Sequence, residues 1–310
     1  MSTELGPPSA SLDTPPSDRA GRVVAALIAL MFFALYWASS AALVARKGTT
    51  HFGADAWFYA EIAKGNVLRR LGEYEVSRIF RFHMTTVLLG AGWVEVLAPL
   101  ARWIPAGELL KAMFAAVGAL GVWGALQTFA TILPRRQSLL WGIVYGSTLG
   151  VWYFASIEES KIVTATLSTL YIAVYARLRM VWSRRRALLL SAILLAACLN
   201  EIVAAFLVAI PALDALVQRG IDLRRDGWII AHGTVAPVVF VIVELVVNRM
   251  LVSPTEHPEG ASHFGMLIYY ITRNDYSLAS IGMFLARWLF FNLAAPERSA
   301  AYWARPEVNY

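Results

Sequence analysis

Long apolar stretches separated by short polar segments dominate the chain, and several are long enough to cross a lipid bilayer. A membrane-spanning helix needs roughly 20 mostly apolar residues. Stretches of this kind, some of them shorter, occupy 23–44, 109–133, 139–155, 162–174 with its flanks, 228–251 and 278–293. The pattern predicts an all-α protein, a polytopic bundle of transmembrane helices that covers 23–295.

Two apolar stretches depart from this simple pattern. Segment 84–103 is interrupted by glycine, glutamate and proline, so it predicts either a full span or a helix half-sunk in the membrane interface. Segment 187–217 has Asn200-Glu201 in its middle; it is too long for one straight span and too short for two complete ones. We expect two short helices that meet at Asn200-Glu201, where polar groups are packed in protein or line a wet cavity.

The two ends of the chain are polar. Residues 1–22 are rich in Pro, Ser and Asp, without apolar periodicity, and predict a disordered tail. Residues 296–310 form a second polar end. Stretch 23–44 is longer than the apolar core of about 7–15 residues in a cleavable secretory signal, so we interpret it as a retained membrane anchor.

Composition supports the membrane class and narrows the set of partners. The 310 residues are 58% hydrophobic and 15% charged, whereas soluble domains are about half apolar and a quarter charged. The net charge of +6 does not indicate nucleic-acid binding, because arginine pairs lie between apolar blocks, where they contact anionic headgroups of membrane lipids. The single cysteine, Cys198, excludes an intrachain disulfide framework and a cysteine-based metal site.

The positions of the basic residues predict orientation. When the spans alternate, Arg135-Arg136, the arginines of 177–186 and those of 219–225 fall on one side, which the positive-inside rule makes cytoplasmic. Glu158, Glu159 and Glu201 then lie outside. The side of Asp55 depends on whether 84–103 crosses. Seven basic residues in 46–81, against two in the tail, favour a crossing, but so many bases beside one acid also suit an anionic ligand, so charge counting leaves this open.

The most informative motif is His51 to Lys64, HFGADAWFYAEIAK, in which Asp55 precedes three aromatic residues. Asp55 could simply be a helix N-cap, a role compatible with a chemical one. An acid followed by aromatics after a first span resembles the GT-C integral membrane glycosyltransferases, which include protein O-mannosyltransferases, bacterial aminoarabinose transferases and the catalytic subunit of oligosaccharyltransferase. Glu158-Glu159, after Trp152-Tyr153-Phe154, resembles the second acidic position of that family.

The resemblance implies a long first outer loop, 46–108, that carries interfacial helices, and an active site on the outer face of a plasma or inner membrane. Two departures stand out. The first loop has a single Asp where the family has an acidic pair, and family members usually run well beyond 310 residues. A truncated, split or minimal member, with a possible partner subunit, is therefore the expectation.

The family chemistry assigns roles to these residues. The donor would be a polyprenyl-phosphate-linked sugar, and Asp55 would be the general base that takes the proton of the acceptor hydroxyl. Arg78 and Arg81 would stabilise the leaving phosphate, although Arg81 could equally be a headgroup anchor. Glu158 and Glu159 would orient the acceptor, or Glu159 and Asp55 would hold a divalent metal ion. The alternative for both glutamates is a solvated turn that pairs with Lys161.

Three further residues are candidates for substrate binding. Glu201 lies near membrane depth, where an acid is costly and suggests function, unless a short outer turn brings it to the surface. His83 could contact phosphate, and Tyr59 could stack on a sugar, although an interfacial filler and a belt aromatic are the ordinary alternatives. The competing hypothesis is a non-enzymatic polytopic protein, either a transporter or a lipid-binding subunit of a larger assembly. Its mark would be a polar path between spans, for which Glu201 and Glu244 are the sequence candidates.

Overall fold

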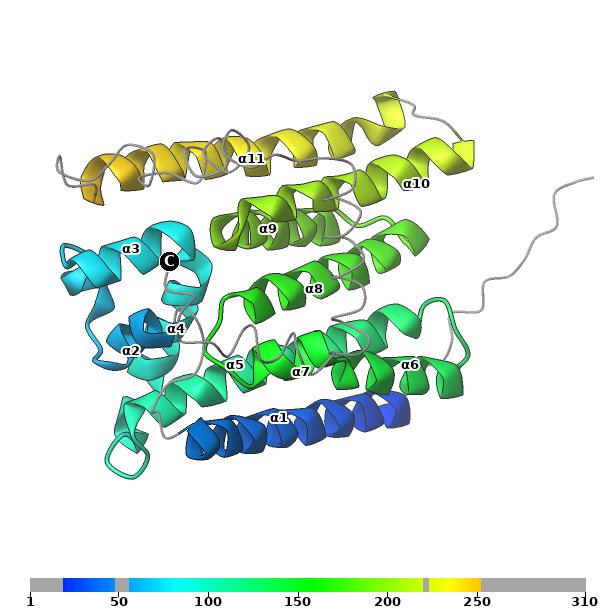
Figure 1. The fold of residues 1–310 in the computed structure, drawn as a ribbon. Coiled ribbons are helices and arrows are strands. Elements are labelled where there is room, and N and C mark those ends of the chain that lie inside the picture. The colour runs from blue at the N-terminus through cyan, green and yellow to red at the C-terminus, as the bar shows by residue number, and fades with distance from the viewer. Residues whose placement is uncertain (1–18, 48–55, 220–222, 252–310) are drawn as a thin grey trace, which may run out of the picture.

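The computed structural model describes residues 19–47, 56–219 and 223–251, and within these ranges every element of secondary structure is a helix (Figure 1). The all-α prediction is thus confirmed for the described residues. In chain order the elements are α1 (Arg19–Lys47), α2 (Ala56–Ala63), η1 (Val67–Arg70), α3 (Tyr74–Phe82), α4 (Met84–Val96), η2 (Ala98–Leu100), α5 (Ala106–Phe129), α6 (Arg135–Ser147), α7 (Leu149–Ala155), α8 (Lys161–Met180), α9 (Arg184–Asn200), η3 (Ile202–Val208), α10 (Ala209–Arg219) and α11 (Leu223–Leu251). Predictions for 1–18, Asp55 and 278–310 lie outside these residues.

Three of the described helices are long and apolar enough to cross a membrane by length and composition: Ala20–Leu43 in α1, Ala106–Phe129 in α5 and Gly227–Val247 in α11. They differ in burial. The apolar window of α5 is 78% buried, whereas those of α1 and α11 are 22% and 24% buried. Large apolar side chains such as Leu27 and Leu245 are exposed on the outer helices. This distribution, with α5 enclosed by other helices, suits a protein whose outer surface faces hydrocarbon.

Small residues let α5 approach its neighbours closely. A Cβ added at Gly118 would lie 2.5 Å from the Cβ of Ala155 in α7, and one at Gly121 would lie 2.7 Å from Oγ1 of Thr166 in α8. Helix α1 is tied to α6 by the Tyr36 hydroxyl, which donates to the carbonyl of Gly146 at 2.7 Å. Close backbone approach at glycine is a common way to pack membrane helices, because burial against lipid supplies little driving force.

Helices α2, α3 and α4 gather at one end of the bundle, where α1 ends and α5 begins (Figure 1). We call this the α2–α4 end. Helix α4 has 13 residues, fewer than the roughly 20 needed to span a bilayer. It packs against α2, α5 and α9, so in this structure segment 84–103 does not run through the bundle alongside the long helices. Its location at a membrane surface stays a prediction.

Two predicted stretches can be compared directly with the helices. The break at Asn200-Glu201 is confirmed, because α9 ends at Asn200 and Glu201 has an extended backbone (φ −153°, ψ 122°) before η3 begins. The uninterrupted span predicted for 139–155 is wrong. Thr148 has ψ 142° and separates α6 from α7, and its hydroxyl donates to the carbonyl of Tyr145 at 2.8 Å. A side chain that bonds its own preceding turn competes with helix continuation.

Most described acidic side chains lie at one end of the bundle, whereas described basic side chains lie at both ends. Five arginines and three lysines are at the α2–α4 end: Lys64, Arg69, Arg70, Arg81, Arg102, Lys111, Lys161 and Arg249. The end opposite α2–α4, which we call the arginine end, holds the start of α1, the α5–α6 and α8–α9 turns and the end of α10 (Figure 1). Eight arginines with described side chains lie there: Arg22, Arg135, Arg136, Arg177, Arg179, Arg184, Arg185 and Arg186. One described acid, Asp214, accompanies them. Seven described acids lie instead at the α2–α4 end: Glu61, Glu73, Glu95, Glu108, Glu158, Glu159 and Glu201.

Candidate functional site

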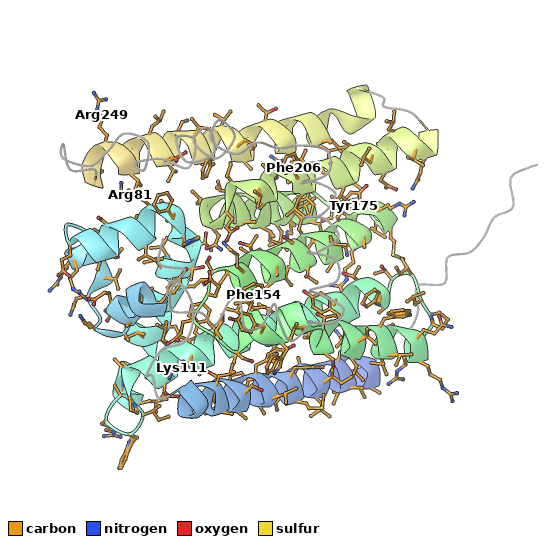
Figure 2. The ribbon with its side chains drawn as sticks, in the orientation of Figure 1. Arg81, Lys111, Phe154, Tyr175, Phe206 and Arg249 are labelled. Carbon is orange, nitrogen blue, oxygen red and sulfur yellow. The ribbon has the colours of Figure 1, made fainter. Side chains whose placement is uncertain are left out.

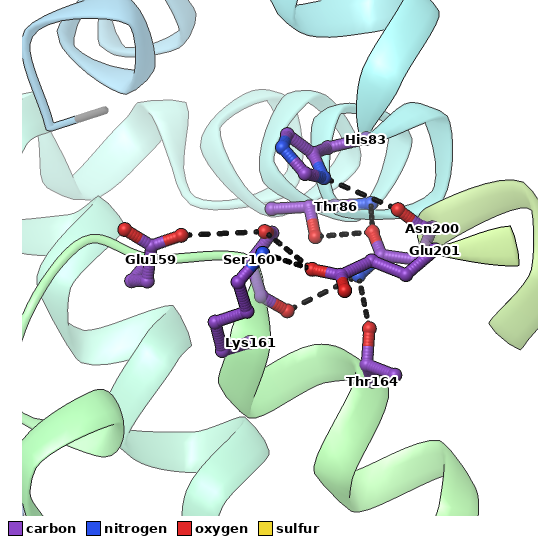
Figure 3. Close-up of polar contacts among 8 residues, drawn as sticks. All are labelled: His83, Thr86, Glu159, Ser160, Lys161, Thr164, Asn200 and Glu201. Atoms are coloured by element: carbon purple, nitrogen blue, oxygen red, sulfur yellow. Dashed lines mark hydrogen bonds and ion pairs between the residues drawn. The ribbon is translucent and has the colours of Figure 1, made fainter. Parts of the chain in front are cut away.

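A buried polar cluster lies where the start of α4, the turn before α8 and the end of α9 meet (Figure 3). Its centre is Asn200, whose side chain is completely buried. The amide oxygen accepts hydrogen bonds from the backbone N–H of Thr86 at 3.0 Å and from its hydroxyl at 2.6 Å. The amide nitrogen donates to the carbonyl of Ser160 at 3.1 Å and to Oγ1 of Thr164 at 2.9 Å. One side chain therefore joins three separate segments.

Asn200 performs for α4 the role that an N-cap residue normally performs. The first N–H groups of a helix have no partner within the helix, and the N-cap residue of α4, His83, makes no side-chain cap hydrogen bond. Asn200 supplies the missing acceptor from a helix far away in sequence. His83 in turn lies with Nδ1 3.1 Å from the carbonyl oxygen of Asn200. Because a carbonyl can only accept, Nδ1 carries the proton, and in the neutral ring Nε2 is the acceptor nitrogen.

Two carboxylates approach a single hydroxyl beside Asn200. Oγ of Ser160 is 3.4 Å from Oε1 of Glu159 and 3.3 Å from Oε1 of Glu201. A hydroxyl has one proton, so it donates to one of these carboxylates at a time. The ammonium of Lys161 lies 2.5 Å from Oε1 of Glu201. The cluster thus brings two acids, one hydroxyl and one cation together in space beside the first turn of α8.

Burial distinguishes the predicted glutamates from an ordinary surface turn. Glu158 is 1% exposed and Glu159 is 6% exposed, so the alternative of a solvated turn does not hold for them. Lys161 also bonds to Glu201, 40 residues along the chain, a partner that the sequence did not predict. Buried carboxylates are costly unless they are paired or hydrogen-bonded, which makes this turn a specialised part of the fold.

The structure brings Glu159, Glu201 and His83 together, but not every predicted residue joins them. Asp55 lies outside the described residues; α2 begins at the next residue, Ala56, at the same end of the bundle. Arg78 is in α3, and its side chain is not among those described. Glu158 neighbours Glu159 in the turn and is buried with it.

Two other predicted residues are enclosed by packing. Arg81 is 5% exposed, its Nε donates to the carbonyl of Ser77 at 3.4 Å, and its guanidinium lies 5.9 Å from the ring centre of Phe82. Figure 2 shows it between α3 and α11. Tyr59 is completely buried, with its ring 5.5 Å from that of Phe114 and edge-on to it. Both side chains are therefore at least as enclosed as Glu159, and their contact with a substrate stays a prediction.

An ion-pair network holds α2 to the segment that follows it. The guanidinium of Arg70 bonds to Glu61 at 2.7 Å and to Glu73 at 2.5 Å, and Lys64 lies 2.5 Å from Glu61. Hydrogen bonds from Lys64 and Arg70 hold the pKa of Glu61 below its ordinary value of 4.5. The hydrogen bond from Arg70 likewise lowers the pKa of Glu73. This network fixes the geometry of the helix that begins immediately after Asp55.

A second buried polar group was not predicted from the sequence. His232 of α11 lies 2.8 Å from the hydroxyl of Tyr171 through Nε2 and 2.8 Å from the hydroxyl of Ser191 through Nδ1. The three residues belong to α11, α8 and α9. The signal in the sequence was a histidine within an apolar stretch, which usually requires a hydrogen-bonding partner on a neighbouring helix.

The fit to a metal ion can be tested on the donor groups. Among the described residues no group of three or more His, Cys, Asp or Glu side chains is placed to hold a metal. Of the two predicted ligands, Glu159 is described and Asp55 is not. A divalent metal therefore stays a prediction from the family resemblance.

Comparisons of the chain with protein-family models, with curated proteins and with solved structures found no match.

Proposed function

We propose that this chain is a membrane glycosyltransferase of the GT-C type, a polytopic helical protein that moves a sugar from a polyprenyl-phosphate donor to an acceptor at the outer face. One observation carries the proposal. Helix α2, which begins directly after Asp55, lies at the same end of the bundle as Glu159 and Glu201 (Figures 1 and 3). A base and acceptor-orienting acids must converge on one face for this chemistry, and this arrangement is consistent with that requirement.

The orientation is part of the proposal. The arginine end carries eight described arginines, but the α2–α4 end carries five described arginines and three described lysines, so the positive-inside rule, which counts basic residues, does not separate the two ends. We place the cluster around Asn200 on the outer face because the family resemblance requires it. In the same frame segment 84–103 belongs to the first outer loop, since α4 packs at the α2–α4 end.

The reaction is a displacement at the anomeric carbon. The acceptor oxygen forms a bond to that carbon while the bond from the carbon to the lipid phosphate oxygen breaks. Asp55 takes the proton from the acceptor hydroxyl, and Glu159 and Glu201, which share the Ser160 hydroxyl, hold the acceptor in position. The leaving phosphate gains negative charge, which Arg78 stabilises. Arg81, being enclosed between α3 and α11, instead maintains the packing of α3.

The decisive experiment measures the release of a labelled sugar from its lipid donor. Membranes that contain the full chain are supplied with labelled polyprenyl-phosphate hexoses and pentoses, and release of the label from the lipid is measured. We expect Asp55→Asn to abolish release while the protein remains folded in the membrane. Glu108→Gln is the matched control, because Glu108 is an acid at the same end of the bundle that pairs with Lys111 and lies outside the network that holds α2. Full release by Asp55→Asn, or none by the unaltered protein with any of these donors, overturns the proposal.

A labelling experiment tests the orientation separately. Cys198 is completely buried and can be replaced by alanine to give a cysteine-free background. In it, Asp55→Cys and Arg184→Cys should react with a membrane-impermeant maleimide from opposite sides, with position 55 accessible from outside. Labelling of both positions from the cytoplasmic side would remove the donor site that the reaction requires.

A further inference from the structure

The turn between α8 and α9 is surrounded by arginines of two kinds. Three of them make contacts that hold the turn. Arg177 bonds to the side chain of Gln127 in α5, Nε of Arg179 is 3.1 Å from Asp214, and Nη1 of Arg186 donates to the carbonyls of Arg177 at 3.1 Å and Val181 at 2.9 Å. These side chains have protein partners, and their positions follow from the packing of α5, α8, α9 and α10.

Arg184 and Arg185 are of the other kind. Both side chains are exposed, and among the described residues neither has an acidic partner or a hydrogen-bond acceptor. They occupy the first turn of α9, which contains no acidic residue. Positive charge at a helix N-terminus opposes the helix dipole, so the helix itself gains nothing from these two arginines. Helix α6 also has two arginines, Arg135 and Arg136, in a first turn that contains no acidic residue.

An exposed aromatic residue adjoins the two free arginines. Trp182 lies in the α8–α9 turn, is 57% exposed, and has its ring 5.4 Å from that of Trp228 at the start of α11. Tryptophan favours the level of the lipid headgroups, where its ring is partly in hydrocarbon and its N–H is in a polar layer. Its position next to Arg184 sets the depth at which the two guanidinium groups would meet a membrane surface.

We propose that Trp182, Arg184 and Arg185 form a binding surface for the headgroup of an anionic phospholipid. The phosphate of such a lipid supplies the negative charge that the first turn of α9 lacks, and guanidinium groups bind phosphate with two parallel hydrogen bonds. The helix dipole, unfavourable for the arginines alone, then adds to the attraction for the anion. This surface lies at the end of the bundle away from the Asn200 cluster and does not depend on the transferase proposal.

The test titrates lipid onto the purified full chain. Delipidated protein in neutral detergent is mixed with phosphatidylglycerol or phosphatidylcholine, and bound lipid is counted by native mass spectrometry. At a contribution of about fivefold in affinity per arginine, Arg184→Gln/Arg185→Gln should weaken phosphatidylglycerol binding roughly 30-fold and leave phosphatidylcholine unchanged. Arg184→Lys/Arg185→Lys, which keeps the charge, should retain most of the preference.

The matched control removes the same charge from the other end. Arg69 and Arg102 are both exposed at the α2–α4 end, and Arg69→Gln/Arg102→Gln should bind phosphatidylglycerol like the unaltered protein. Equal losses in the two double variants would show a diffuse effect of net charge and overturn the proposal. Undiminished binding by Arg184→Gln/Arg185→Gln would also overturn it, as would displacement of the lipid by a short oligonucleotide or an acidic peptide at equal charge. Circular dichroism checks that each variant is folded.

Discussion

Replacing Asn200 by alanine should loosen the contact between α4 and the rest of the bundle. The side chain makes four hydrogen bonds, two to Thr86, one to the carbonyl of Ser160 and one to the hydroxyl of Thr164. The hydroxyl groups can rotate toward other partners, and the carbonyl of Ser160 keeps the backbone N–H groups of Val163 and Thr164 as donors. The backbone N–H of Thr86 has no such alternative, so the substitution leaves it unsatisfied in a site where Asn200 is completely buried.

The magnitude follows from this group. A buried polar group that loses its partner costs about 1–3 kcal/mol, and the other three hydrogen bonds add less because their partners rotate or keep other bonds. We expect Asn200→Ala to lower the free energy of unfolding by roughly 2–4 kcal/mol. Asn200→Asp should not rescue the loss. Its carboxylate can accept from Thr86, but it presents negative charge to the Ser160 carbonyl in place of a donor.

Unfolding of the purified protein in mixed micelles, with increasing denaturing detergent, measures the loss. A double-mutant cycle with Thr86→Val isolates the contact across the interface, and the coupling should be at least about 1 kcal/mol. Thr131→Val is the control for the cycle, because Thr131 donates locally to the carbonyl of Thr128 and should be additive with Asn200→Ala. A loss below about 1 kcal/mol, or additivity with Thr86→Val, would refute this account of how α4 is held.

Three further outcomes are expected. Gly118→Ala should lower the unfolding free energy by roughly 1–3 kcal/mol because its Cβ has no room, whereas Gly92→Ala, with nothing within 4 Å, should raise it by about 0.5–1 kcal/mol; melting curves of both test this. Since Lys64 and Arg70 lower the pKa of Glu61 from 4.5, the pairing stabilises the fold above that pH, and this stability is lost as pH falls through the lowered value. Melts between about pH 3 and pH 7 should show a smaller acid loss for Glu61→Gln.

Much of the fold was predictable because apolar stretches of bilayer length leave few alternatives to helices. The break at Asn200-Glu201 was also predictable, since a polar pair within 31 apolar-rich residues must find partners or leave the hydrocarbon. The break at Thr148 was not, because a hydroxyl bond to the preceding turn leaves no mark in hydropathy. The packing of 84–103 needed the structure as well. Charge counting left the side of the membrane open, and the structure shows α4 packed against α2, α5 and α9, while the place of the segment relative to a membrane stays a prediction.

The candidate site was predictable residue by residue but not as a whole. Glu159, Glu201 and His83 each stood out as a polar group in or beside an apolar stretch. Their connection through Asn200 did not, because the bonds that make it join residues 114 and 40 positions apart in the chain. Tyr59 shows the opposite case. An aromatic residue after an acid could stack on a sugar. The ring of Tyr59 is instead completely buried against Phe114, and the spacing of residues in the sequence does not reveal this burial.

The transport hypothesis requires polar side chains that continue from one end of the bundle to the other. Along α9 the described residues form two separate polar groups instead, one around Asn200 and one around His232. On α9 they are separated by Leu194 and Cys198, both completely buried. A transporter must expose this layer during its cycle, whereas a transferase need not, because its lipid phosphate and acceptor meet on one face. Cys198 should therefore stay unreactive toward a small membrane-permeant maleimide in the folded protein. Rapid modification without unfolding would favour transport, because it would show that the layer between the two polar groups opens.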